Sequence, residues 1–218
     1  MGRTEYELLW IRVGVQMFGK SVIAGMFIAL GCMVNLKVGG YLGAFLFSFG
    51  LLSVVLYAVP LYTGRAGFCS TVEDLRHLPL VLLGNVVGTT ILAGCAYGCF
   101  PDMVEAAQKI AQVRMTSSLY AGFFASVLCG FIMTTIVQFT RKQPEGGESR
   151  NFLILILGIP LFILSGYWHS IADAFYYGVA GRFDISMLWL YPMTVVGNYL
   201  GCNAYNLLVH RSVFYHKV

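Results

Sequence analysis

The chain has 218 residues, of which 58% are hydrophobic and only 11% are charged, and its formal net charge is +4. A soluble domain of this size normally carries about a quarter charged residues. The composition therefore argues against a water-soluble protein with a large core. It also argues against a nucleic-acid-binding protein, because the basic residues lie in short polar segments and form no continuous stripe.

Long stretches without Asp, Glu, Lys or Arg divide the chain. A bilayer core of roughly 30 Å needs about 20 apolar residues of helix. Five stretches exceed that length and the first nearly reaches it: 21–36, 38–64, 77–101, 115–140, 151–172 and 185–210. We therefore expect an all-α integral membrane protein with six transmembrane helices. A single transmembrane domain would cover residues 1–218, with halves at about 18–100 and 116–210.

In chain order, the expected helices cover 18–34, 40–58, 78–99, 116–139, 152–164 and 186–209. The second reaches a break at 59–64, where proline removes a backbone donor and glycine permits open conformations. The fifth meets polar residues at 165–170. The segments 101–115 and 141–150 are expected to be polar connections. Residues 1–16 carry four charges and no unbroken apolar run, so we expect no signal peptide.

The basic residues are unevenly divided between the two predicted sides of the membrane. Ten of the fourteen Lys and Arg residues lie on the side that holds both termini, and four lie on the other. Positive charge favours the cytoplasm, so we expect both termini inside and the protein in the cytoplasmic membrane.

None of the six cysteines forms a Cys-x-x-Cys pair, and most lie in apolar runs. We expect them to be free thiols, with no disulfide and no metal.

The two halves share a Gly-Asn-x-x-Gly motif, at 84–88 and at 197–201. Each copy follows an interrupted helix, and the copies lie three predicted helices apart, in the third and the sixth, so the halves have opposite orientation. This is the pattern of an inverted repeat, which places broken helices around a site near the middle of the membrane. The spacing of the glycines also permits close contact between helices.

His169 lies deep in the fifth apolar run, beside Ser170 and four residues before Asp173. Ionisable groups inside a membrane are costly, so they usually face a cavity or a partner. One interpretation is a hydrogen bond within the helix bundle. The other is a polar or protonatable group in a permeation path, which suits histidine because its ordinary pKa is about 6.5. The other three histidines lie beside charged segments: His77, His210 and His216.

The residues around this histidine carry a family resemblance. The run Ser-Gly-Tyr-Trp-His-Ser-Ile-Ala-Asp at 165–173 resembles the Ser-Gly-Phe-Glu-His-Ser-Ile-Ala-Asn signature of the formate/nitrite transporter family. Leu-Tyr-Thr-Gly at 61–64 resembles the Leu-Phe-Thr-Gly/Ser break in the second helix of that family. The two Gly-Asn-x-x-Gly copies are similar to motifs in its third and sixth helices. The resemblance extends over about 18–210.

The resemblance implies an aquaporin-like protomer with broken helices two and five, assembled as a homopentamer with a pore through each subunit. It also implies roles by position. His169 would be central with Thr63 facing it, Phe47, Leu51 and Leu61 would line one apolar constriction, Phe162 would line the other, and Arg114 would lie in the vestibule.

The chain departs from the family pattern at four positions. Trp168 replaces a glutamate, Asp173 and Gly130 replace asparagines, and Arg114 replaces a lysine. Arginine keeps the positive charge but cannot give up its proton as a lysine can. The changes could also create an Arg114–Asp173 ion pair.

The expected function is that of a channel or transporter for small monovalent anions of weak acids, namely formate, nitrite or hydrosulfide, and not that of an enzyme. The anion would be neutralised at or near His169, because a bare anion loses water at high cost in an apolar ring. We expect a lipid bilayer and a small anion as partners, and no cofactor or nucleic acid.

Three alternatives stay open. An aquaporin-like channel for neutral solutes shares this logic, but the chain has no Asn-Pro-Ala. A haem-binding subunit needs two deep histidines. A purely structural protein would not need broken helices.

Overall fold

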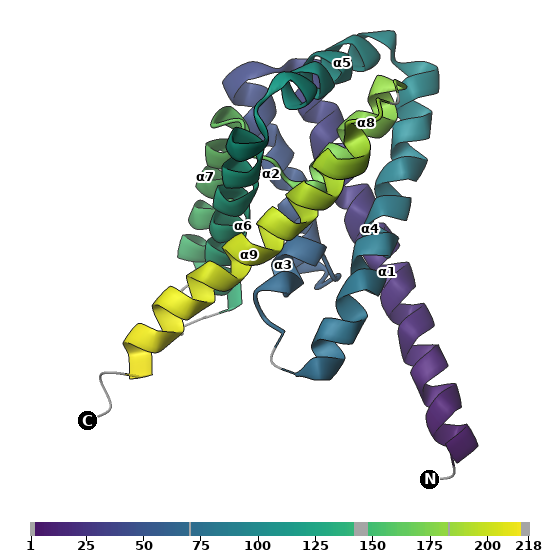
Figure 1. Ribbon diagram of the computed structural model, residues 1–218, viewed down its shortest axis with the longest axis vertical. Helices are drawn as coiled ribbons and strands as arrows, with labels where there is room; N and C mark the ends of the chain where they lie inside the picture. Colours follow the sequence, from purple (N-terminus) through teal and green to yellow (C-terminus); the bar gives the residue numbers. More distant parts are fainter. Residues whose placement is uncertain (1–2, 70, 142–147, 183, 215–218) are drawn as a thin grey trace.

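The computed structural model describes residues 3–69, 71–141, 148–182 and 184–214 (Figure 1). All regular structure in this part of the chain is helical, which confirms the all-α prediction. The helices are α1 (Arg3–Val38), α2 (Gly40–Leu56), α3 (Tyr62–Ala66), α4 (Val72–Cys99), α5 (Pro101–Thr116), α6 (Leu119–Arg141), α7 (Glu148–Leu164), α8 (Ser170–Ala180) and α9 (Met187–Phe214).

Several helices have the length and composition of membrane spans. Within the described residues, three are long and apolar enough to cross a bilayer, over Arg12–Val38, Val72–Cys99 and Leu119–Thr140. Two shorter apolar helices cover Gly40–Leu56 and Phe152–Leu164. Large apolar side chains remain exposed on the helices, among them Leu42, Phe49, Leu83, Phe124 and Leu157. Such extensive exposed apolar surface suits contact with lipid. The total of six spans stays a prediction.

Two segments are more helical than the sequence predicted. The polar connection expected at 101–115 is itself the helix α5, a structure that the sequence analysis did not assign to it. Pro101 occupies the first turn, where its missing N–H removes no helical bond, and Glu, Ala, Gln and Lys favour helix along the segment. Helix α1 begins at Arg3 rather than near residue 18, because no proline interrupts this stretch. Of the polar connection expected at 141–150, residues 142–147 lie outside the described part of the chain.

The two predicted breaks are present and divide helices that run in opposite directions. The second helix is interrupted between α2 and α3, and the fifth between α7 and α8. Helix α1 begins and α9 ends at the same end of the molecule, while α5 crosses the opposite end (Figure 1). We call these the terminal end and the α5 end. Helix α1 packs along α4, and α6 packs along α9 in the second half.

The repeated glycines allow these two helix pairs to approach closely. A β-carbon on Gly88 would collide with the backbone carbonyl of Val22 in α1. A β-carbon on Gly201 would collide with the backbone carbonyl of Val127 in α6. The Gly-Asn-x-x-Gly copies therefore serve as contact surfaces, as small residues do between membrane helices. Equivalent positions in the two halves make equivalent contacts, as expected of an inverted repeat.

Candidate pore and vestibule

The asparagine of the first Gly-Asn-x-x-Gly motif holds the first helix break. The Asn85 side chain accepts a hydrogen bond from the backbone N–H of Tyr62 (2.8 Å). Its amide group donates to the carbonyls of Ser21 (2.8 Å) and Pro60 (3.0 Å). A broken helix leaves backbone groups without helical partners, and such groups are costly in a membrane. Asn85 supplies the partners and ties the break to α1.

The second motif repeats this arrangement around the other break. Asn198 accepts from the backbone N–H of Ser170 (2.8 Å) and donates to the carbonyls of Ser126 and Trp168 (both 2.8 Å). Asn85 and Asn198 are both fully buried. The sequence singled out the motif for its glycines, but it gave no indication that the asparagines hold the breaks.

His169 is the residue that precedes α8, and both nitrogens of its imidazole take part in hydrogen bonds. Its Nδ1 accepts a hydrogen bond from the backbone N–H of Ala172 (3.2 Å), so the ring caps the helix. Its Nε2 lies 3.0 Å from the hydroxyl oxygen of Thr63, in the first turn of α3. Because Nδ1 accepts, the proton of the neutral ring is assigned to Nε2, which donates to Thr63. Both side chains are buried.

Apolar rings lie beside this central pair. The ring of Phe162 lies 5.7 Å from the imidazole of His169, measured between centroids. Phe47 meets Phe162 edge-on at 5.8 Å. The structure thus places Phe47 against Phe162, although the family resemblance assigns them to opposite constrictions. Leu51 and Leu61 are buried as well.

A cavity of about 530 Å³ opens beside His169 toward the α5 end of the molecule. Its lining includes Phe162 and His169 from the pore, Lys109 and Arg114 from α5, and Asp173 from α8. We call this cavity the vestibule. Asn35 and Tyr176 also line it, and they are joined by a hydrogen bond of 3.3 Å. The sequence offered no signal for these two, because neither lies in a motif.

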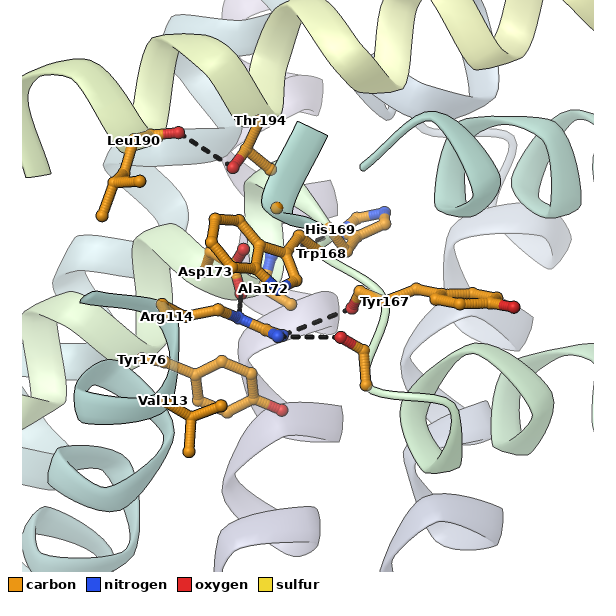
Figure 2. Close-up of polar contacts among 12 residues, drawn as sticks. Val113, Arg114, Tyr167, Trp168, His169, Ala172, Asp173, Tyr176, Leu190 and Thr194 are labelled. Carbon is orange, nitrogen blue, oxygen red and sulfur yellow. Dashed lines mark hydrogen bonds and ion pairs between the residues drawn. The ribbon is translucent and has the colours of Figure 1, made fainter. Parts of the chain in front are cut away.

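Arg114 holds the turn that leads to His169. Its guanidinium donates to the carbonyls of Gly166 (2.8 Å) and Tyr167 (3.3 Å). Figure 2 shows the indole of Trp168 over the guanidinium of Arg114. The imidazole of His169 points away from that guanidinium. The guanidinium carbon lies 4.9 Å from the centre of the indole, a distance at which a cation and an aromatic face attract. Arginine is suited to this position because its planar fork reaches two carbonyls at once.

Asp173 supplies the counter-charge. One carboxylate oxygen lies 3.4 Å from Nε of Arg114, so the ion pair suggested by the sequence is present. Both side chains are buried, and neither carboxylate oxygen has a hydrogen-bond partner in the described part of the protein. The pair therefore neutralises the vestibule arginine, but its contact is incomplete. A buried pair of this kind gains little over apolar packing, yet loss of one partner is costly.

A second, smaller cavity of about 300 Å³ lies between α2, α3 and α6, toward the terminal end. Leu51 and Leu61 form part of its wall, together with Gly64, Arg65 and Thr140. Neither Thr63 nor His169 lines this cavity. Among the described residues, no three His, Cys, Asp or Glu side chains gather as a metal site would require. The cysteines are free thiols.

Comparisons with known proteins agree over most of the chain. The family model described as Formate/nitrite transporter matches residues 11–211. The formate channel FocA of Haemophilus influenzae is 26% identical over 147 residues, which are 61% of this chain and 51% of that protein. The match thus spans about half the length of this curated relative.

Two solved structures have the same fold. A pentameric formate channel with formate bound superposes with a TM-score of 0.80 at 19% identity, over 94% of this chain and 98% of that one. An ion channel of the FNT family has a TM-score of 0.76 at 20% identity, over 96% and 93%. At these identities the likeness establishes the fold.

Proposed function

Because the chain belongs to the formate/nitrite transporter family, a family of multi-pass membrane transporters, we propose that it conducts small monovalent anions of weak acids. Formate, nitrite and hydrosulfide are the candidate substrates. The observation that carries this proposal is the buried Thr63–His169 contact, whose imidazole borders the vestibule and lies beside the ring of Phe162.

The proposed path begins in the vestibule and passes Phe162 and Phe47. It continues past His169 and Thr63 and leaves between Leu51 and Leu61. A bare anion would lose its water at high cost among these apolar side chains, whereas the neutral acid crosses far more easily. The substrate is therefore proposed to cross the apolar section in its protonated form. Arg114 and Asp173 are proposed to shape the vestibule side of this path.

The proposed proton role of His169 has a specific structural consequence. In the hydrogen-bonding pattern described above, the imidazole carries one proton, on Nε2, and Nδ1 accepts from Ala172. A second proton on Nδ1 would displace the Ala172 N–H. Protonation of His169 is thus coupled to loosening of the first turn of α8, and the neutral ring otherwise acts as a hydrogen-bond donor.

We further propose a homopentamer in the cytoplasmic membrane. The solved relative with formate bound is described as pentameric, and its fold extends over nearly this whole chain. Both ends of the described chain lie at one end of the molecule (Figure 1). The excess of Lys and Arg predicted on this side supports a cytoplasmic orientation.

The test is flux into proteoliposomes that contain the purified protein. Formate, nitrite and hydrosulfide are offered separately across a pH series, and glycerol is offered in a shrinkage assay as the neutral-solute alternative. We expect anion flux that rises toward acidic pH and no glycerol flux. Glycerol flux without anion flux would contradict the proposal.

The proton role is tested with His169→Phe in the same assay. The matched control is His77→Phe, which makes the same substitution in α4 at a residue that lines neither the vestibule nor the smaller cavity. We expect His169→Phe to change both the rate and its pH dependence, and His77→Phe to change neither. An unchanged pH profile in His169→Phe would rule out proton transfer at this residue.

A further inference from the structure

The α5 end of the molecule carries as many acidic as basic residues. These are Lys37, Lys109, Arg114 and Arg182, against Asp102, Glu105, Asp173 and Asp184. Ion pairs join Lys37 to Asp102 at 2.5 Å and Lys109 to Glu105 at 2.8 Å. Arg114 faces Asp173 as described above. Three of the four cations thus have a carboxylate partner.

The two exposed pairs, Lys37–Asp102 and Lys109–Glu105, hold their charges at neutral pH. The hydrogen bond from Lys37 lowers the pKa of the exposed Asp102 carboxyl below its ordinary value. The hydrogen bond from Lys109 does the same to the pKa of Glu105. Both carboxylates therefore remain ionised and continue to offset the lysines. The vestibule end has little net positive charge with which to attract an anion from a distance.

The excess positive charge lies at the other end. By the predicted topology, the segments on the terminal side carry ten basic and six acidic residues, which accounts for the whole net charge of +4. Of these basic residues, Arg65 borders the smaller cavity directly, beside Leu61 and Gly64. Its side chain is exposed. A positive charge at the mouth of an apolar-walled hollow concentrates anions there, because such walls focus the field.

The inverted repeat gives Arg65 a counterpart in the other half. Arg65 lies three residues after Tyr62, whose N–H is held by Asn85. Asp173 lies three residues after Ser170, whose N–H is held by Asn198. Equivalent positions in the halves thus carry opposite charges. The acidic residue is buried against Arg114, whereas the basic one is exposed at a cavity.

We propose that Arg65 forms a capture site for small monovalent carboxylates and similar anions at the terminal mouth, on the far side of Leu51 and Leu61 from His169. The planar guanidinium can donate two parallel hydrogen bonds to a carboxylate such as formate. The inference rests on the proposed function and adds an electrostatic asymmetry to it. Anions approaching from the terminal side meet a charged mouth, and those approaching from the α5 side meet a neutral one.

The test compares three variants in sealed membrane vesicles of both orientations, with the terminal side identified by accessibility of a C-terminal tag. Arg65→Gln removes the charge, and Arg65→Lys keeps it but loses the planar fork. Arg76→Gln is the matched control, because Arg76 is an exposed arginine near the start of α4 that does not line the cavity. Initial formate flux is measured at ionic strengths of about 0.01 M and 0.15 M, since screening increases over this range.

For formate supplied at the terminal side at low salt, we expect Arg65→Gln to raise the half-saturation concentration about 3- to 10-fold, which is at or below the low end of electrostatic steering effects because a single charge is removed. The effect should shrink at higher salt and be absent when formate is supplied at the other side. Arg65→Lys should show a smaller change, and Arg76→Gln should resemble the wild type. Equal effects of Arg65→Gln and Arg76→Gln would overturn the capture site, as would an effect independent of side.

Binding is measured separately from transport, so that the two proposals fail in different ways. The thermal midpoint of the detergent-solubilised protein is recorded with sodium formate and with sodium gluconate at equal ionic strength. A ligand that binds the folded protein stabilises it, so formate should raise the midpoint of the wild type but not of Arg65→Gln. If the wild type moves no anion but shows this difference, the transport proposal fails and the site stands. An equal midpoint shift in both proteins overturns the site.

Discussion

The hydroxyl oxygen of Thr63 and Nε2 of His169 lie 3.0 Å apart, although 106 residues separate them in the chain. Each belongs to a different broken helix, so the contact joins the two halves of the inverted repeat at their centre. The repeat is asymmetric at this point. Leu61 precedes α3 where His169 precedes α8, so one half supplies an apolar side chain and the other an imidazole.

The Thr63–His169 contact predicts unequal effects of two small substitutions. Thr63→Val keeps the shape of the side chain but leaves the buried Nε2–H without its acceptor, which costs about 1–3 kcal/mol. Thr63→Ser keeps the hydroxyl. We therefore expect a clear fall in the thermal midpoint in detergent for Thr63→Val and a small one for Thr63→Ser. Formate flux should follow the same order, and a valine variant as stable and active as the serine variant would contradict the contact.

The Arg114–Asp173 pair predicts an asymmetric cost of neutralisation. Asp173→Asn leaves Arg114 bonded to the carbonyls of Gly166 and Tyr167 and stacked on Trp168. Arg114→Gln leaves the buried carboxylate with no counter-charge, and breaking a buried pair in this way costs about 3–5 kcal/mol. The free energy of unfolding should fall much more in Arg114→Gln than in Asp173→Asn.

The double variant Arg114→Gln/Asp173→Asn is the internal control for this comparison. It removes both charges, so it should recover part of the stability lost in Arg114→Gln. Equilibrium unfolding of all three variants in one detergent measures the coupling. A double variant that is the sum of the two singles would show that the charges do not interact.

Much of the fold could be predicted from the distribution of charge and of helix-breaking residues. The charge-free runs predicted the apolar helices, and the segments around Pro60 and His169 predicted the breaks. The polar connection expected at 101–115 forms a helix, because its polar residues are good helix formers. Sequence hydropathy reports where a segment lies relative to the membrane and not whether it is helical.

The site was predictable where a residue is unusual for its surroundings. His169 stood out because an ionisable group in an apolar run is costly. The packing of Phe47 against Phe162 was not predictable, since phenylalanine is common in apolar helices and its partner depends on how the helices approach. The roles of Asn85 and Asn198 were hidden for a related reason: their partners are backbone groups in distant segments.

The matching hydrogen bonds of Asn85 and Asn198 predict similar losses from Asn85→Ala and Asn198→Ala. Each substitution removes the partner of one buried N–H and two carbonyls at a helix break. A single buried backbone group left unsatisfied costs about 1–3 kcal/mol. Both variants should therefore unfold at clearly lower temperature and conduct formate poorly. A thermal midpoint close to that of the wild type in either variant would show that water replaces the asparagine at that break.

The glycines of the repeated motif, Gly88 in α4 and Gly201 in α9, predict a sharp contrast with Gly94, which lies elsewhere in α4. An alanine β-carbon at either position would meet a carbonyl of the neighbouring helix, Val22 or Val127, so the helices must separate. Overpacking of this kind costs about 1–3 kcal/mol. Gly94→Ala is the matched control, because a β-carbon there has no neighbour within 4 Å. It should stabilise the protein slightly, by about 0.5–1 kcal/mol, through the higher helix preference of alanine.

Gly88→Ala and Gly201→Ala should both lower the thermal midpoint. Both should also reduce anion flux, because each motif carries the asparagine that holds a break. Equal thermal midpoints for all three variants would mean that close contact at the repeated motif does not stabilise the fold.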